Sequence, residues 1–178
     1  MEPTDAALVQ RSLSGDAEAF STLVARHYDR VFRVAWTITG HRAEAEDLAQ
    51  DICAALPGKL QSFRHEARFS TWLHRVTVNA ARDRHRRQAT HERAAANWGE
   101  VEQMRRAETA EAQAQLTWLQ EAMGALPRDL RETAALVLGE DMTHSDAAQA
   151  LGVSEGTVSW RMSEIRRRLK DMAAKEAT

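Results

Sequence analysis

The sequence predicts an all-α protein with two small helical domains joined by a flexible linker. Apolar residues recur at intervals of three and four along most of the chain, and no strand-like alternation of useful length occurs. Eight glycines and three prolines among 178 residues leave few breaks, and a composition rich in Ala, Leu, Glu and Arg favours helix. The apolar periodicity is lost at 89–113, the predicted linker, which separates helical domains at 1–88 and 114–178. Trp98 is the one large apolar residue of this linker.

The first long helix is predicted between Asp16, whose side chain can cap it, and Gly40, which ends it. Seven residues at helical spacing mark its inward face: Phe20, Leu23, Val24, His27, Val31, Val34 and Ile38. A second helix runs from about Arg42 and carries "AEAEDLAQDICAAL". We expect it to kink or stop at Pro57-Gly58, because the proline ring would clash with the carbonyl of Cys53.

The second domain begins with a helix near Leu116, "LTWLQEAMGAL", which stops at Pro127. The next helix, "PRDLRETAALVL", ends at Gly139. Thr143 with Asp146 three residues later resembles a capping box that opens a short helix, "HSDAAQAL".

Two helices joined by a tight turn at Gly152 form a helix-turn-helix pattern, and Ser154 is expected to cap the second of them. Its inward face is predicted to be Val158, Met162, Ile165 and Leu169. The outward residues suited to base contacts are Ser159, Trp160, Ser163 and Glu164, and those suited to phosphates are Arg161, Arg166, Arg167 and Lys170. The alternative is a solvated helical hairpin. An outward Trp160 between basic residues favours DNA binding.

The charges are unevenly distributed around a net charge of −2. Residues 64–87 hold seven arginines and two acids, a net charge of +5, and residues 160–170 hold five basic residues and one acid, a net charge of +4. Residues 1–58 hold nine acids and five arginines, a net charge of −4. Two basic regions predict two nucleic-acid contacts, with another partner for the acidic part.

The composition also predicts where the protein acts. A single cysteine, Cys53, excludes an internal disulfide and fits a reducing compartment. The start, "MEPTDAALVQ", is unlike a signal peptide, and no apolar run is long enough to insert directly into a membrane. We therefore expect a soluble cytoplasmic protein.

A third long helix is expected to start at Ser70 or a neighbour, after the loop "KLQSFRHEARF". Its polar ridge, which we expect to bind DNA, consists of Arg75, Asn79, Arg82 and Arg86. An exposed Phe63 in the loop could stack on an unpaired base, although a place in the core is an equal alternative. Phe69 and Trp72 are expected in the core.

Four stretches in order, "AEDLAQDI", "FRHEARFSTWLHRVTVNAARDRHRR", "LPRDLRETAALVL" and "AAQALGVSEGTVSWRMSEIRRRL", resemble a bacterial RNA polymerase sigma factor of the extracytoplasmic-function (ECF) group. The resemblance covers almost the whole chain. It implies that 1–88 is sigma region 2, which binds core polymerase and the melted −10 element. It also implies that 114–178 is sigma region 4, whose helix-turn-helix reads the duplex −35 element.

The resemblance also implies roles for particular residues. The polymerase-binding candidates are Asp47, Leu48, Gln50 and Asp51, whose acids suit a basic partner surface. Phe63 and Asn79 match positions around a flipped-out −10 base. Ser159 and Glu164 stand where the family often has basic residues, so we expect a different promoter sequence. A carboxylate can accept from the amino group of cytosine, so we expect a cytosine opposite Glu164 in the −35 element. Such sigma factors are commonly held inactive by an anti-sigma protein, often membrane-bound or zinc-binding.

Two other classes of function fit the sequence less well. A standalone helix-turn-helix regulator would leave the basic stretch from Phe63 to Arg87 unexplained. An enzyme is disfavoured, because the chain has no phosphate-binding loop, no H-E-x-x-H motif and no Cys-His cluster. We therefore expect no catalytic residue, no bound metal and no cofactor.

Overall fold

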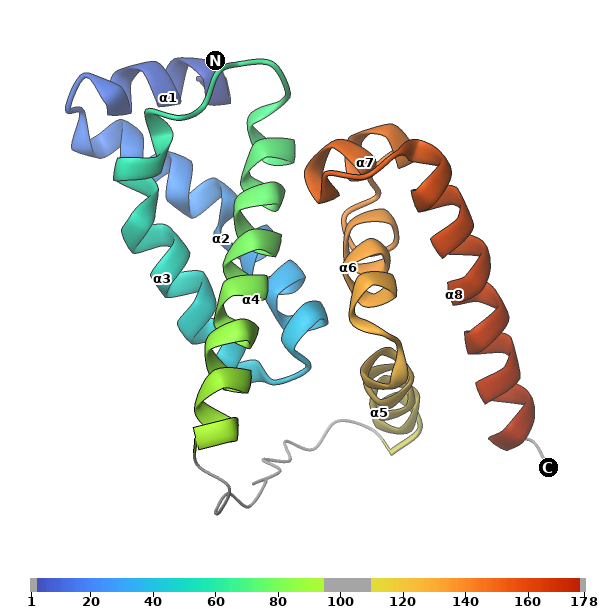
Figure 1. Cartoon of the computed structure of the whole chain (residues 1–178). Coiled ribbons are helices and arrows are strands. Elements are labelled where there is room, and N and C mark those ends of the chain that lie inside the picture. Colours follow the sequence, from blue (N-terminus) through green and yellow to red (C-terminus); the bar gives the residue numbers. More distant parts are fainter. Residues whose placement is uncertain (1–2, 95–109, 177–178) are drawn as a thin grey trace.

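The computed structural model describes the backbone of residues 3–94 and 110–176 and the side chains of 3–88 and 118–175. These residues form helices with no strand, as predicted. An N-terminal bundle contains α1 (Asp5–Leu13), α2 (Ala17–Thr39), α3 (Arg42–Leu60) and α4 (Phe69–Ala94). A C-terminal bundle contains α5 (Ala110–Ala125), α6 (Arg128–Val137), α7 (His144–Leu151) and α8 (Glu155–Glu176) (Figure 1). Much of the predicted linker, with Trp98, lies outside the described residues.

The predicted caps of α2 are confirmed. The Asp16 carboxylate accepts a hydrogen bond from the backbone N–H of Ala19 at 3.0 Å, and Gly40 ends the helix in the left-handed conformation at φ 75°. The sequence analysis had not identified α1, which Thr4 caps and which buries Leu8 and Val9. A short helix of this kind is fixed by its docking on α2 rather than by its own propensity.

Of the kink or stop expected at Pro57, the stop is wrong, because α3 continues to Leu60 with the proline inside it. Pro57 itself is exposed, whereas Leu56 and Leu60 on either side are buried in the core. A proline removes one backbone hydrogen bond, and the burial of two leucines offsets that loss over the last turn.

The helix-turn-helix is confirmed in its details. Thr143 accepts a hydrogen bond from the N–H of Asp146 at 3.1 Å and donates one to its carboxylate at 2.8 Å. Gly152 has a φ of 70°, and the Ser154 hydroxyl accepts from the N–H of Thr157 at 3.1 Å. The inward residues of α8 are buried or partly buried as expected: Val158, Met162, Ile165 and Leu169.

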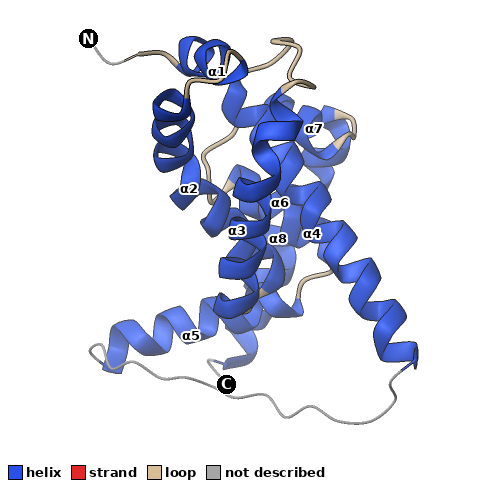
Figure 2. Cartoon of the chain, turned by 90° about the vertical axis from the view of Figure 1, so that its left-hand side faces the viewer, coloured by secondary structure: helices blue, strands red, loops and turns tan. Residues whose placement is uncertain are grey.

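The two bundles lie against each other. Helix α6 packs beside α2, and α7 packs beside α4, so elements more than fifty residues apart in the sequence form one junction. Figure 2 shows α5 projecting from the base of this assembly. The junction places α4, which carries the predicted −10 ridge, directly against α7 of the C-terminal bundle.

The turn of the helix-turn-helix offers a test of stability. Gly152→Ala should lower the free energy of unfolding by about 1 kcal/mol, because alanine disfavours the left-handed conformation of this residue. A Cβ there would meet no atom within 4 Å, so steric overlap would add nothing to the loss. Gly124→Ala, at an uncrowded position within α5, should instead raise it by up to about 1 kcal/mol. Urea denaturation followed by circular dichroism measures both. Equal effects would contradict the conformational explanation.

Candidate nucleic-acid interface

The outward face of α8 presents a large apolar ring to solvent. Trp160 is 63% exposed, and Ser159 and Ser163 beside it are also exposed. The hydroxyl of Ser159 lies 2.9 Å from Nδ1 of His144, in the first turn of α7. The first helix of the motif therefore helps to orient a side chain that the sequence analysis assigned to base contacts.

Glu164 on this face is bound to two arginines of its own helix. Its carboxylate accepts from Arg167 Nε and Nη2 at 2.9 and 2.7 Å, and from Arg168 Nε at 2.7 Å. These hydrogen bonds lower the pKa of Glu164 to about 2, so the side chain is ionised at neutral pH. The carboxylate thus fixes the directions of two guanidinium groups at the place where DNA is expected to lie.

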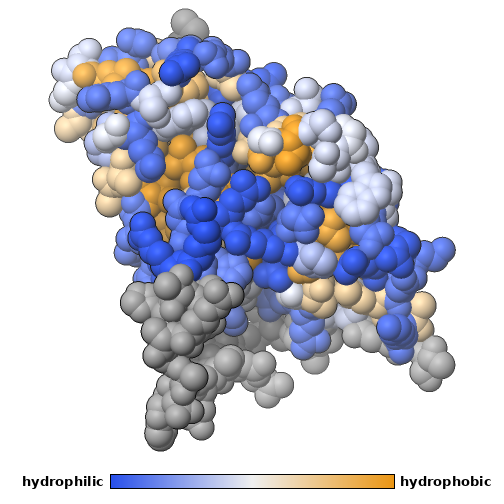
Figure 3. Space-filling view, viewed as in Figure 1, coloured by the Kyte–Doolittle hydropathy of each residue, from blue (hydrophilic) through white to orange (hydrophobic). Residues whose placement is uncertain are grey.

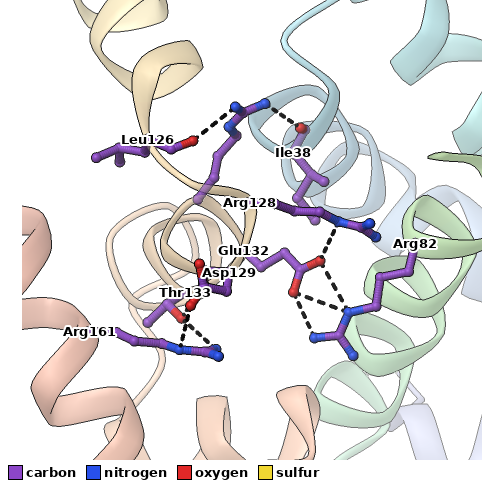
Figure 4. Close-up of polar contacts among 9 residues, drawn as sticks. Ile38, Arg82, Leu126, Arg128, Asp129, Glu132, Thr133 and Arg161 are labelled. Atoms are coloured by element: carbon purple, nitrogen blue, oxygen red, sulfur yellow. Dashed lines mark hydrogen bonds and ion pairs between the residues drawn. The ribbon is translucent and has the colours of Figure 1, made fainter. Parts of the chain in front are cut away.

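The remaining predicted phosphate contacts differ in accessibility. Arg166 and Lys170 are exposed, and Arg167 is 60% exposed. Arg161 is only 13% exposed, since its guanidinium lies 3.4 Å from both the Asp129 carboxylate and the Thr133 hydroxyl of α6 (Figure 4). Arg161 therefore links α8 to α6 in this conformation.

On α4, the polar ridge of Arg75, Asn79, Arg82 and Arg86 faces the C-terminal bundle along part of its length. Arg75, Asn79 and Arg86 are exposed, and Arg86 pairs with Asp83 one turn away. Figure 3 shows hydrophilic side chains gathered over the lower part of α4 and along α8. The two basic stretches of the sequence thus form two separate hydrophilic surfaces.

Phe63 is only 8% exposed, so of the two alternatives that the sequence left open, the ring takes the place in the core in this conformation. It packs on Phe69 and Trp72 with ring centroids 5.5 and 5.4 Å away, and the His65 ring lies 4.4 Å away. A loop that returns the chain to the bundle can bury its aromatic residue against the start of the next helix. Its role at the −10 element stays a prediction.

The predicted polymerase-binding residues of α3 divide into two groups. Asp47, Gln50 and Asp51 are exposed, and the two carboxylates lie 3.4 and 3.6 Å from the guanidinium of Arg84 on α4. Leu48 is 3% exposed and belongs to the core. Any contact with a partner in this conformation would therefore use the polar residues, with Leu48 holding α3 in place.

A polar cleft of about 770 Å³ lies where the two bundles meet, lined by Asn79, Arg82, Asp83, Arg86, Arg128, Asp129 and Glu132. Glu132 of α6 is only 2% exposed. Its carboxylate accepts from Arg82 Nη2 at 2.6 Å, from Arg82 Nε at 3.1 Å, and from Arg128 Nε at 3.1 Å (Figure 4). A residue of the predicted −10 ridge is therefore bound to the opposite bundle.

A second acidic residue makes contacts across the same junction. Glu140, in the turn after α6, has a 5% exposed side chain and accepts from Arg33 Nε of α2 at 3.0 Å. The buried His74 of α4 lies 3.8 Å from the same carboxylate. Burial, helped by Arg30 and Arg33, lowers the pKa of His74 to about 4, so the imidazole is neutral at pH 7.

Neither Glu132 nor Glu140 was singled out by the sequence analysis. Glu132 follows Arg128 by four residues, a spacing typical of an exposed helical ion pair. Only the position of α4 makes it a buried residue, so local sequence carries no signal for its role. Glu140 lies in a turn, where acids are ordinarily solvated.

Two other kinds of site are absent from the part of the chain that the structure describes. Within the described residues, no group of three or more His, Cys, Asp or Glu side chains is placed to hold a metal ion. No helix among them is long and apolar enough to cross a membrane.

A helix-turn-helix in one bundle and an exposed basic ridge in the other are typical of DNA-binding transcription proteins. Models of two protein families match the chain in order: Sigma-70 region 2 over residues 23–91 and Sigma-70, region 4 over residues 116–169. The chain is 34% identical over 170 residues to ECF RNA polymerase sigma factor SigM of Mycobacterium tuberculosis, covering 94% of this chain and 84% of SigM. The chain belongs to the ECF group of the sigma-70 family.

Other relatives agree with this assignment. ECF sigma factor SigE of Mycolicibacterium smegmatis is 30% identical over 189 residues, covering 99% of this chain and 70% of SigE. The solved structure of CnrH in complex with the cytosolic domain of CnrY has a TM-score of 0.72 at 26% identity, over 94% of this chain and 96% of CnrH. Sigma factor RpoE, solved with anti-sigma factor NepR from Bartonella quintana, has a TM-score of 0.77 at 22% identity, over 89% and 98% of the two chains.

The neutral His74 predicts a loss of stability in mild acid. Unfolded histidine takes up a proton near pH 6.5, whereas folded His74 does so near pH 4, so the unfolded chain binds more protons between these values. The free energy of unfolding should fall by about 2 kcal/mol from pH 7.5 to pH 5 through this residue. Denaturation of His74→Gln should show a flatter pH dependence. His85→Gln, at an exposed position on the same helix, should keep the slope of the unmodified protein.

Proposed function

We propose that this chain binds core RNA polymerase and directs it to promoters by recognising a melted −10 strand and a duplex −35 element. The observation that carries the proposal is the order of the two family regions on a chain whose last helix exposes Trp160 between basic residues. The chain itself performs no chemistry in this role, because the polymerase supplies it. Since polymerase and promoter occupy the cytoplasm, the protein acts there.

In this proposal α8 enters the major groove of the −35 element. Arg166, Arg167 and Lys170 bind phosphates, which supplies affinity without sequence information. Arg161 joins them if it leaves its contact with α6. The base-reading side chains are the exposed Ser159, Trp160 and Ser163, together with Glu164, whose side chain is 17% exposed.

The N-terminal bundle holds the opened −10 strand. Arg75, Asn79 and Arg86 are exposed on α4 and can contact it directly, with arginines on phosphates and the amide on a base edge. Arg82 can join them only after it releases Glu132. Phe63 can stack on a flipped base only after its loop moves, because the ring is now packed on Phe69 and Trp72.

An anti-sigma protein is the second partner that we propose. CnrH was solved in complex with the cytosolic domain of CnrY, and RpoE with the anti-sigma factor NepR. The similarity to CnrH extends over both bundles, so a regulator that holds both together fits the shape of this chain. Whether that regulator is membrane-bound or binds zinc depends on its own sequence.

Transcription in vitro tests the function. Purified core polymerase with this protein should initiate from its cognate promoter, which start-site mapping in cells overproducing the protein will identify. Core polymerase alone should not initiate there. A standalone regulator would bind duplex DNA but give no initiation with core polymerase, and that result would overturn the proposal.

Glu164 should set one base of the −35 element. Glu164→Gln or Glu164→Arg should reduce the preference for cytosine opposite this position by about tenfold, since a carboxylate can accept from the cytosine amino group. Transcription from a promoter library randomised at the −35 element measures the preference. Selection at the −10 element and core polymerase affinity serve as internal controls. An unchanged preference would mean that Glu164 only orients Arg167 and Arg168.

The exposed acids of α3 should contribute to polymerase binding. Replacing both, Asp47→Asn with Asp51→Asn, should weaken the affinity for core polymerase by about tenfold, because two negative charges that face a basic partner are lost. Glu46→Gln is the matched control on the same helix, since Glu46 pairs with Arg42. Fluorescence anisotropy with labelled protein measures the affinities. Equal affinities in all three proteins would place the polymerase contact elsewhere.

A further inference from the structure

The hydroxyl of Ser159 has a different partner from that of many other hydroxyls in this fold. Hydroxyls within its helices commonly donate to the backbone carbonyl four residues earlier; examples are Thr22, Thr37, Thr77, Thr133 and Ser163. The hydroxyl of Ser159 instead lies 2.9 Å from Nδ1 of His144, on the other helix of the helix-turn-helix. His144 therefore sets the position of the Ser159 oxygen.

The backbone on both sides of this contact is fixed. His144 is the first residue of α7 and follows Thr143, whose hydroxyl accepts from the N–H of Asp146 and donates to its carboxylate. Ser154 caps α8 by accepting from the N–H of Thr157. Since both helices begin at a satisfied cap, the imidazole and the hydroxyl are held at a defined distance from each other.

The second ring nitrogen of His144 is open. The side chain is partly buried, and among the residues that the structure describes no group bonds to its Nε2. When the second helix of such a motif lies in the major groove, the first helix crosses the DNA backbone. Because Nδ1 is occupied by Ser159, Nε2 is the atom of His144 that can contact a phosphate.

We propose that His144 is a positioning residue for the −35 element, which contacts a phosphate through Nε2 and fixes the hydrogen-bonding polarity of Ser159 through Nδ1. Phosphate oxygens only accept hydrogen bonds, so Nε2 must carry the proton of a neutral imidazole. Nδ1 of that imidazole is then an acceptor. Ser159 therefore donates its only hydroxyl hydrogen to His144 and presents lone pairs alone to a base. This inference rests on the proposed function, because it assigns α8 to the −35 element.

The neighbouring polar residues of α8 have the same polarity. Ser163 donates its hydroxyl hydrogen to the carbonyl of Ser159 at 3.2 Å, so its oxygen also has only lone pairs to offer. Glu164 is ionised and can only accept. In the major groove adenine and cytosine each present an amino donor, whereas guanine and thymine present none. We therefore expect adenine or cytosine opposite Ser159, with His144 setting this preference.

Two substitutions of His144 separate its two contacts. His144→Asn keeps an acceptor at the position of Nδ1 and removes Nε2, whereas His144→Gln has a donor that reaches as far as Nε2 and no polar atom at the position of Nδ1. Ser159→Ala identifies the base that Ser159 contacts. Gln149→Ala, at an exposed position on the same helix, is the control. Each full-length variant is checked for folding by circular dichroism and combined with core polymerase at about pH 8, where imidazole is ordinarily neutral.

Transcription from a promoter library randomised at the −35 element reports base preference, and anisotropy of a labelled promoter fragment reports affinity. Ser159→Ala and His144→Gln should each lower the preference for adenine or cytosine by about fivefold, at the same position of the element. His144→Asn should keep that preference and weaken the affinity for all promoters alike by about threefold. Gln149→Ala should match the unmodified protein.

Several results would overturn the proposal. A preference for guanine or thymine at the position that Ser159→Ala identifies would make Ser159 a donor. An unchanged preference in His144→Gln, or the same change in Gln149→Ala, would remove any specific role of Nδ1. Unchanged affinity in His144→Asn would remove the phosphate contact and the polarity that depends on it. Failure of the unmodified protein to initiate with core polymerase would instead count against the proposed function.

Discussion

The burial of one carboxylate constrains how the whole molecule is arranged. Glu132 lies inside the junction, so each of its oxygens requires a donor. Arg128 donates to one oxygen from within α6, while the remaining hydrogen bonds come from Arg82 on α4. This requirement fixes the distance and direction between α6 and α4. The other anchors, Glu140 on Arg33 and Arg131 on the carbonyl of Ile38, are compatible with that one placement.

The two bundles also share an apolar core. Their buried leucines, valines and alanines belong to one hydrophobic cluster, which includes Leu8 and Val9 of α1 and Ile165 of α8. The hydrogen bonds named across the junction involve charged side chains and add to this apolar burial. Burial favours close packing without fixing a direction, whereas the polar anchors select one placement of the two bundles.

Local physics explains why some features could be predicted from the sequence and others could not. Helical periodicity and the caps at Asp16, Thr143 and Gly152 depend on residues a few positions apart, and the structure confirms them. The stop expected at Pro57 does not occur, because burial of neighbouring leucines outweighs one lost hydrogen bond. The sequence left the place of Phe63 open, and its contacts with Phe69 and Trp72, six and nine residues later, bury it. The burial of Glu132 depends on α4, which is distant in sequence, so no local pattern could reveal it.

Glu132 and Glu164 show how the same residue type acquires different roles. Glu164 binds arginines three and four positions later on its own helix, so its contacts persist whatever the bundles do. Such pairs at a helix surface contribute little to stability, but they fix the direction of the arginines. Glu132 instead depends on an arginine of another bundle. Separation of the two bundles would therefore remove the contacts between Glu132 and Arg82 and leave those of Glu164 with Arg167 and Arg168 on α8 unchanged.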